Sequence, residues 1–390
     1  MQRIRIVRRL SRLVLILLFI EFLDELLFGI FEAAWPLIRN DFGLTYTQIG
    51  LLLSVPGIIS AVIEPGIGLL GDVWRRRTLI VGGGILFAFS AFMTAAGESF
   101  AILMLALIAM YPASGAFVSL SQATLMDTDP ERHEHNMARW TFAGSLGVVV
   151  GPIVLGIALT FNLGWRFTFV AWGALALAAA IMVATGPTFP INGSEEDDEE
   201  AGSWSQLKSA LRSARSFEVW RWLILLQFSD FMLDGLYSYM ALYMVDVMGM
   251  SATQAGWAIA VWTGVGLIGD LLLIPLLERI NGITYLRFSV IMQLILYPAF
   301  LLVPSLEIKL IILGLMGLFN AGWYAILQGR LYTSMPGKSG TVMALSSVTG
   351  LVGSLLPLAI GVVATQHGLQ TALWVLFLGP VMLFFGLPRR

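Results

Sequence analysis

The stretch Leu13–Ile38, LVLILLFIEFLDELLFGIFEAAWPLI, decides how this chain is interpreted. It has the length and apolarity of a membrane-spanning helix, which needs about 20 such residues. Four carboxylic acids interrupt it: Glu21, Asp24, Glu25 and Glu32. At about 100° per residue, the three glutamates fall within roughly 40° of one another, and Asp24 lies beside them. Because a carboxylate inside a bilayer is costly, this stripe predicts an aqueous cavity or ion path; structural partners inside a helix bundle are the alternative.

The composition predicts an integral membrane protein. Of 390 residues, 57% are hydrophobic and 12% are charged, against roughly a quarter charged in soluble domains. Apolar windows of spanning length recur, which favours helices over a β-barrel. The chain has no cysteine and only three histidines, all in predicted loops, so we expect no cofactor and no metal site. The arginine-rich start, residues 1–12, precedes a run without a cleavage pattern and is interpreted as part of a retained first helix.

Twelve membrane-spanning helices are predicted. They cover 13–37, 46–70, 79–97, 101–125, 138–160, 166–186, 219–243, 252–277, 286–303, 308–332, 340–364 and 370–387. Arginine and lysine concentrate in the loops on one side, so both termini are expected to be cytoplasmic in a multi-pass protein of the cell (inner or plasma) membrane. The predicted organisation is a bundle over 1–186, a cytoplasmic linker over 187–218 and a bundle over 219–390. The linker holds an acidic run, 195–200, and a segment, 204–215, that could form a short amphipathic helix.

The two halves repeat each other at a shift of 206 residues. Gly43-Leu44-Thr45 recurs as Gly249-Met250-Ser251. The same shift pairs Asp24 with Asp230, Glu64 with Asp270, Gln122 with Gln328, Gly144 with Gly350, and Gly147 with Gly353. Internal repetition of this kind is typical of secondary transporters, which bind substrate near the midplane between the repeats.

The loop after the second helix, Gly68-Leu69-Leu70-Gly71-Asp72-Val73-Trp74-Arg75-Arg76-Arg77, resembles the cytoplasmic loop signature of the major facilitator superfamily. Gly68 would let another helix approach closely. Asp72 would pair with a helix N-terminus or with Arg139, and Arg76 or Arg77 would bind helix-end carbonyls. Such links are expected to latch the cytoplasmic side shut. The family usually has glycine where Arg75 stands, and the equivalent second-half loop, 276–280, is degenerate.

The fifth helix carries Gly147, Gly151, Pro152 and Gly156, a pattern that resembles the one associated with antiporters in this superfamily. Glycines permit close helix packing and proline bends a helix, so packing explains much of the pattern, but the resemblance favours export. The first helix is also similar to that of bacterial fosmidomycin-resistance-type exporters, through Asp24-Glu25 and Trp35-Pro36. The fourth helix departs from those exporters, because Ser119-Leu120-Ser121-Gln122 stands where they have His-Pro-Glu.

Further charged and aromatic residues fall inside the predicted spans. Asp230 and Asp234 lie one turn apart on the seventh helix, where two carboxylates resist being ionised together and suit a proton acceptor. Arg330, near the end of the tenth helix, is expected either to meet an acid or anionic substrate or to reach the membrane surface. Aromatic and methionine side chains of the second half could line an adaptable apolar cavity: Met232, Tyr237, Tyr239, Met240, Trp257, Trp262, Trp323 and Tyr324.

Together these features predict an all-α major facilitator fold of two pseudo-symmetric six-helix bundles. The expected function is proton-coupled export of small amphipathic or cationic organic compounds, with Glu21, Asp24, Glu25, Asp230 and Asp234 as coupling candidates. The expected partners are a small-molecule substrate, protons and the lipid bilayer, without nucleic acid, and the protein is expected to be a monomer. The alternatives are an inorganic cation carrier, a nutrient symporter and a non-transporting receptor. An enzyme is not expected, because the chain has neither a nucleotide-binding glycine loop nor a set of residues for nucleophilic catalysis.

Overall fold

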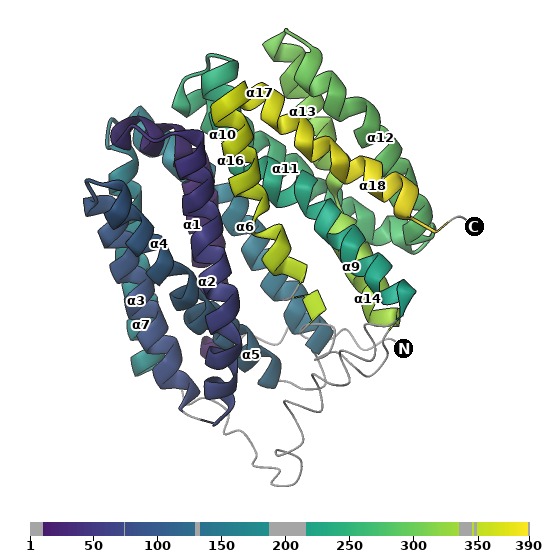
Figure 1. Ribbon diagram of the computed structural model, residues 1–390. Helices are drawn as coiled ribbons and strands as arrows, with labels where there is room; N and C mark the ends of the chain where they lie inside the picture. The colour runs from purple at the N-terminus through teal and green to yellow at the C-terminus, as the bar shows by residue number, and fades with distance from the viewer. Residues whose placement is uncertain are drawn as a thin grey trace, which may run out of the picture.

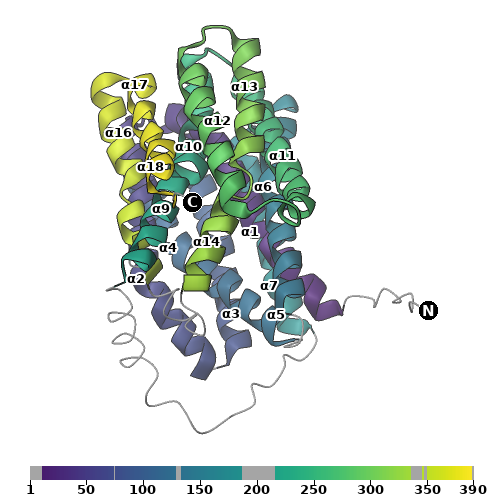
Figure 2. The ribbon, with the colours of Figure 1, turned by 90° about the vertical axis from the view of Figure 1, so that its right-hand side faces the viewer.

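The described residues form an all-helical membrane protein of two bundles. The computed structural model describes residues 11–73, 75–128, 133–186, 216–334, 345–346 and 349–388. In Figure 1 the purple-to-blue helices of the first half stand on one side and the green-to-yellow helices of the second half on the other. In Figure 2 the second half faces the viewer. The linker predicted over 187–218, including its possible amphipathic helix over 204–215, lies outside the described residues except for its last three.

The first half contains α1 (Arg12–Phe42), α2 (Tyr46–Val73), α3 (Arg76–Ala96), α4 (Phe100–Ser114), η1 (Gly115–Ser119), α5 (Leu120–Asp127), α6 (His133–Thr160) and α7 (Gly164–Thr185). The stretch α4–η1–α5 is one continuous span. Six spans therefore correspond to the six predicted for this half. The helix α1 is longer than expected at its far end, and it stops where Gly43 adopts a left-handed backbone (φ 62°). The helix α6 begins at His133 rather than at residue 138, so two of the histidines expected in loops fall on its first turn.

The second half contains α9 (Phe217–Asp230), η3 (Phe231–Gly235), α10 (Leu236–Leu242), η4 (Tyr243–Val247), α11 (Ala252–Leu277), α12 (Gly282–Leu302), α13 (Leu306–Asn320), α14 (Trp323–Ser334), α16 (Leu356–His367), α17 (Leu369–Leu373), η5 (Trp374–Phe377) and α18 (Leu378–Gly386). The run α9–η4 is one span, as are α13–α14 and α17–α18. Part of the predicted span 340–364 lies outside the described residues.

Ten helical stretches among the described residues are long and apolar enough to cross a membrane. The two further spans of the fold are α1 and the α9–η4 run, which carry most of the acids discussed above. The twelve-helix fold is therefore confirmed. In each of these ten stretches, between 17% and 50% of the most apolar window is buried within the protein, as expected for helices that also face lipid.

Three segments of these spans are π-helical: η1, η3 and η4. A π-helical turn leaves a local irregularity in the hydrogen-bond ladder and is found frequently at functional sites. The acid Asp234 lies within η3, and η1 follows directly after Ser114. These irregular turns therefore fall beside polar groups of the interior.

The helices α1 and α6 pack with their backbones in close contact. A Cβ on Gly147 would lie 2.8 Å from the amide nitrogen of Leu26, and one on Gly151 would lie 2.6 Å from the carbonyl oxygen of the same residue. A Cβ on Gly29 of α1 would in turn lie 2.8 Å from a carbonyl oxygen of α6. Small residues at such a crossing allow van der Waals contact that larger side chains would prevent. The glycine pattern of the fifth span thus acts in packing against the first.

The molecule has two ends that differ in their contacts. We call the end with residues 75–77, 186 and 277–281 the basic end, and the end with the turns at 43–45, 97–99, 249–251 and 303–305 the opposite end. The two halves meet at the opposite end, where Asp246 accepts hydrogen bonds from Arg39 and from the Tyr46 hydroxyl (2.7 Å). We call these three residues, together with the pairs given next, the opposite-end contacts.

The helices α2 and α16 complete the opposite-end contacts. The Thr47 amide donates to the Thr365 hydroxyl (3.0 Å), and the Leu358 amide donates to the Ser54 hydroxyl (3.1 Å). A Cβ on Gly50 would lie 2.7 Å from the Pro357 carbonyl oxygen, so the two backbones almost touch. The opposite end is therefore closed between the halves.

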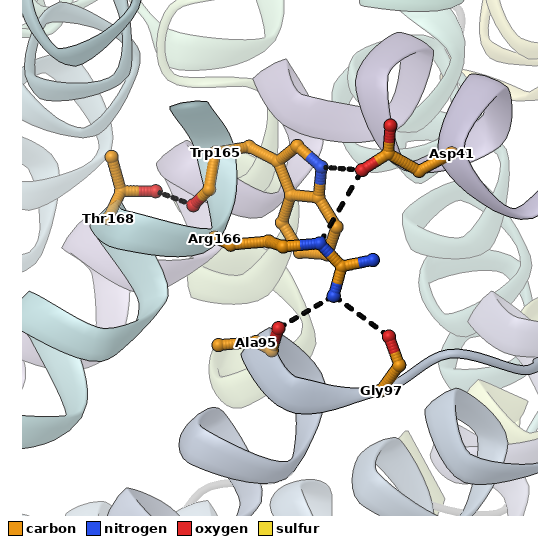
Figure 3. Close-up of polar contacts among 6 residues, drawn as sticks. All are labelled: Asp41, Ala95, Gly97, Trp165, Arg166 and Thr168. Carbon is orange, nitrogen blue, oxygen red and sulfur yellow. Dashed lines mark hydrogen bonds and ion pairs between the residues drawn. The ribbon is translucent and has the colours of Figure 1, made fainter. Parts of the chain in front are cut away.

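A second polar cluster at the opposite end lies entirely within the first half (Figure 3). The Arg166 guanidinium donates to the carbonyl oxygens of Ala95 (2.6 Å) and Gly97 (2.8 Å), and its Nε lies 3.6 Å from the Asp41 carboxylate. The Trp165 indole also donates to Asp41 (2.7 Å). This cluster fixes the ends of α1, α3 and α7 relative to one another without involving the second half.

Candidate functional site

A cavity of about 1530 Å³ lies between the two halves. Its lining extends to Met137 near the start of α6 and to Leu277 at the end of α11, both toward the basic end. The residues Arg39, Tyr46 and Asp246 of the opposite-end contacts do not line it. Along the part of the chain that the structure describes, the cavity therefore extends toward the basic end and stops short of the closed opposite end.

The cavity is acidic. Seven carboxylic acids line it, and no described lysine, arginine or histidine does. The seven are Asp24, Glu25, Glu32, Glu64, Asp230, Asp234 and Asp270. The two ion pairs formed among the described residues, Arg39–Asp246 and Arg166–Asp41, lie outside this set. A cavity with this charge attracts cations or holds protons.

In the wall formed by the first half, hydroxyl groups hold two of the acids. The Ser114 hydroxyl donates to the Asp24 carboxylate (2.9 Å), and the Ser60 hydroxyl donates to Glu64 (2.6 Å). Gly115, the first residue of η1, leaves the space that Glu64 occupies, because a Cβ there would lie 2.8 Å from its Cγ. The π-helical turn thus presents both a donor and a gap to the acids of this wall.

The wall formed by the second half uses backbone groups as well. The Gly322 amide at the junction of α13 and α14 donates to Asp270 (3.0 Å). The Asn320 side chain donates to the Met232 carbonyl oxygen within η3 (3.2 Å) and accepts from Gln293 (2.6 Å). This buried amide pair holds the irregular turn that carries Asp234.

One acid lies where the two halves touch. The side chain of Glu32 is only 2% exposed, and the Ser238 hydroxyl donates to its Oε1 (3.1 Å). Its other oxygen, Oε2, is buried without a hydrogen-bond partner, as is the neighbouring hydroxyl of Tyr237. Both residues line the cavity. A buried polar atom without a partner is unfavourable, and the Trp35 indole also interacts with the Glu32 carboxylate.

The structure separates the candidates that line the cavity from those that do not. Glu21 is buried against Gly144 between α1 and α6 and does not line the cavity, because its side chain faces the crossing with α6 and not the second half. Arg330 donates to the Asn281 side chain at the basic end (3.2 Å) and does not line the cavity, because its long side chain reaches the helix end. Of the aromatic and methionine candidates, Tyr239, Met240 and Trp257 face away, whereas the others line the cavity as expected: Met232, Tyr237, Trp262, Trp323 and Tyr324.

The basic-loop residues form contacts within the first half. The Arg77 guanidinium donates to the carbonyl oxygens of Val183 (2.9 Å), Ala184 (2.8 Å) and Gly186 (3.0 Å), and the Arg76 Nε donates to the carbonyl of a residue in its own loop (3.2 Å). Arg77 therefore binds helix-end carbonyls as expected, and these contacts join α3 to the end of α7.

The remaining members of the predicted latch are less informative. A Cβ on Gly68 would have no described atom within 4 Å, so the close approach expected there is not made, whereas Gly71 packs against Leu120. The side chain of Asp72 lies outside the described residues. Arg139 is half-buried near the start of α6, and the predicted pairing between these two residues stays a prediction.

Sequence analysis missed the most buried cation of the described chain. Lys309, near the start of the span α13–α14, is 2% exposed; it donates to the Tyr243 hydroxyl (2.7 Å) and to carbonyl oxygens at the end of α12. It also missed Ser114, Ser238 and Asn320. The repeat shift could have found Ser238, which is the repeat partner of Glu32, whereas Ser114 and Asn320 are repeat partners of each other and neither was a candidate.

Residues 17–357 match the family model of the Major Facilitator Superfamily. Among curated proteins, the quinolone resistance protein NorA of Staphylococcus aureus (strain MRSA252) is 28% identical over 174 residues. That match spans 44% of this chain and 44% of NorA, less than half the length of the relative.

Two solved structures share the whole fold. A bacterial homologue of the human lysosomal transporter Spinster, in an inward-facing and unoccupied conformation, superposes with a TM-score of 0.76 at 19% identity and covers 96% of both chains. The nucleoside transporter NupG gives a TM-score of 0.75 at 16% identity, over 96% of this chain and 98% of that one. At these identities the likeness concerns the fold.

Proposed function

Because the chain belongs to the Major Facilitator Superfamily and is therefore a multi-pass membrane transporter, we propose that it exports small amphipathic or cationic organic compounds in exchange for protons. The observation that carries this proposal is the cavity between the halves, with seven acids and no described basic side chain in its lining. Such a cavity attracts a cation and repels an anion.

The apolar part of the cavity supports an organic substrate. Phe28 of α1 stacks on Tyr237 of α10 with ring centroids 5.5 Å apart, and Tyr237 lies 5.8 Å from Trp262 of α11. Aromatic faces bind cations and apolar surfaces alike. A substrate with both an apolar body and a positive charge uses both features of the wall.

Proton exchange follows from the charge of the same groups. Seven carboxylic acids line one cavity without a described basic side chain among them. Their charged forms repel one another, so they bind either protons or a cation. When the cavity faces the cytoplasm, an organic cation displaces protons from the acids; when it faces outward, protons displace the cation. The coupling residues proposed are Asp24 and Asp230 first, with Glu25 and Asp234 beside them.

The direction of export depends on which end faces the cytoplasm. The excess of arginine in the loops of the basic end favours a cytoplasmic location for that end by the positive-inside rule. The cavity extends toward the same end. The substrate would thus enter from the cytoplasm or from the inner leaflet, as is needed for efflux. The similarity to NorA, a quinolone resistance protein, is consistent with this direction.

Transport by purified protein in vesicles tests the proposal. With protein reconstituted into liposomes and a pH gradient imposed, tetraphenylphosphonium and ethidium should move against their gradients in the direction opposite to the proton flow. Asp24→Asn and Asp230→Asn should each lower the initial rate by about tenfold or more, the factor that corresponds to the loss of one charge-assisted contact.

A charge-matched control separates the cavity from the surface. Glu307→Gln lies in the first turn of α13, outside the cavity, and should keep the wild-type rate. Equal rates in Asp24→Asn, Asp230→Asn and wild type would overturn the proposed coupling. Movement of a metal cation or a nutrient, but of no organic cation, would overturn the proposed substrate class.

A further inference from the structure

The cavity lining preserves the repeat relation between the two halves. Several residues 206 positions apart line the same cavity from opposite walls. Ten such pairs occur among the described lining residues, among them Asp24 with Asp230, Glu64 with Asp270, Phe31 with Tyr237, Glu32 with Ser238, and Ser114 with Asn320. Two of the ten pairs consist of one acid on each wall. Each wall therefore carries its own set of acids, with two positions matched between the sets, and Glu25 and Glu32 of the first-half wall also interact electrostatically with Asp234 of the second-half wall.

The two sets belong to different halves and have separate supports. Asp24 is held by Ser114, and its carboxylate lies near enough to Glu64 to interact with it electrostatically. Asp230 interacts in the same way with Asp234, and Asp270 is held by a backbone amide of its own half. Each wall thus offers a site for one positive charge.

Aromatic rings and unpartnered polar atoms lie between these sets. The Phe28–Tyr237 stack joins α1 to α10, so it spans the boundary between the halves. Beside it, Glu32 Oε2 and the Tyr237 hydroxyl are buried without partners and line the cavity. The boundary itself therefore offers an apolar surface and the unsatisfied Tyr237 hydroxyl, which is a second indication of a ligand-binding position.

We propose that the cavity binds organic dications, molecules with a positive charge at each end of an apolar spacer, lying across the boundary with one charge on the wall of each half. This deepens the proposed function and rests on it for transport, although binding is measured separately. A molecule with a single charge makes one such charge contact, whereas a dication makes two, and its spacer covers the aromatic rings between them.

Binding of matched ligands to the purified full chain tests this arrangement. Decamethonium carries a trimethylammonium group at both ends of its spacer, and decyltrimethylammonium carries one on the same chain length. We expect the wild type to bind decamethonium about tenfold or more tightly than the monocation, because a second charge-assisted contact has about that effect. Hexamethonium, with a shorter spacer, measures how far apart the two sites lie.

Single substitutions on each wall should remove this preference. Asp24→Asn and Asp230→Asn should each lower the ratio of the two affinities to within about twofold of unity, while the affinity for the monocation falls less. Glu307→Gln, outside the cavity, should keep the wild-type ratio. The thermal midpoint of each variant without ligand checks that it is folded.

The outcomes separate this inference from the proposed function. A wild-type ratio near unity would overturn the two-wall site, even if monocations are exported under a pH gradient. A ratio lowered by only one of the two substitutions would also overturn it, because the ligand would then use a single wall. A high ratio that both substitutions abolish would support the site, even if vesicles show no proton-driven transport and the proposed function fails.

Discussion

The two halves use the same repeat positions for different purposes. In the first half, Gly147 of α6 lies against the backbone of α1, with the Leu26 amide nitrogen 2.8 Å from where a Cβ would be. Its repeat partner in the second half, Gly353, lies against the end of the flexible Gln227 side chain and lines the cavity. The acids Asp24 and Asp230 occupy matching positions in both halves and line the same cavity.

This difference shows which features of the repeat serve packing and which serve the cavity. The glycines of the fifth span bring two helices of one half into backbone contact. The corresponding glycines of the eleventh span leave open space at the cavity wall: a Cβ on Gly350 would have no described atom within 4 Å. Acids therefore occupy matching positions in the two halves at Asp24 and Asp230 and at Glu64 and Asp270, whereas close helix packing at these glycine positions belongs to the first half.

The largest effect is expected from adding a methyl group at the two partner glycines. Gly147→Ala should destabilise the protein by about 1–3 kcal/mol, because backbone atoms of α1 cannot move aside without separating the helices. Gly353→Ala should be neutral or stabilising by up to about 1 kcal/mol, because Gln227 can rotate and alanine favours helix. Thermal unfolding in detergent measures both. Equal losses at the two positions would contradict the asymmetry.

An intermediate effect is expected from the arginines that bind helix ends at the basic end. Arg77→Gln removes contacts to three carbonyl oxygens of the α7 end and should cost about 1–2 kcal/mol of stability. Arg221→Gln removes a contact to the Gly386 carbonyl oxygen at the end of α18 and should cost less. Thermal midpoints rank the two variants. A change in which side of the cavity is accessible, without loss of stability, would instead support a latch between the halves.

The smallest effect on stability is expected at the contacts that join the halves. Asp246→Asn weakens the partly exposed pair with Arg39, a change of up to about 1 kcal/mol. If the contact is weakened, the opposite end should open more often, and a cavity residue should be labelled faster by a reagent added at that end. The increase should be up to about fivefold, because about 1 kcal/mol corresponds to about a fivefold change in an equilibrium constant. The chain has no cysteine, so a single Leu53→Cys substitution gives a clean site for an impermeant maleimide.

The matched control for this experiment lies at the same end. Asp41→Asn also removes an acid from an ion pair, but Asp41 contacts Arg166 and Trp165 within the first half (Figure 3). It should leave the labelling rate unchanged. Equal increases in Asp246→Asn and Asp41→Asn would show that labelling reports general loosening and not separation of the halves.

The sequence predicted the fold because apolarity and charge alone identify membrane helices. Twelve spans and the 206-residue repeat follow from runs of apolar residues and from residue identities at fixed spacing. All seven acids that line the cavity could be recognised as exceptions within such runs or as repeat partners of one. Burial of an acid in a membrane is costly enough that its presence alone predicts a polar interior.

The direction in which a side chain points could not be predicted in the same way. Glu21 and Glu25 share one stripe of α1, yet only Glu25 lines the cavity, because α6 covers the position of Glu21. Lys309 is hidden because its long side chain turns back to the end of α12. The partners of Arg77 also depend on which helix end lies nearby, which the spacing of the motif does not specify.

The central claim is that protons and an organic cation compete for the same carboxylates. The most direct test is to measure protons released when decamethonium binds purified protein in weakly buffered solution, over a range of pH. At pH values where the acids are protonated, the wild type should release protons when decamethonium binds. The double variant that carries both Asp24→Asn and Asp230→Asn should release fewer protons. Tight binding to wild type without proton release at any pH would contradict the account.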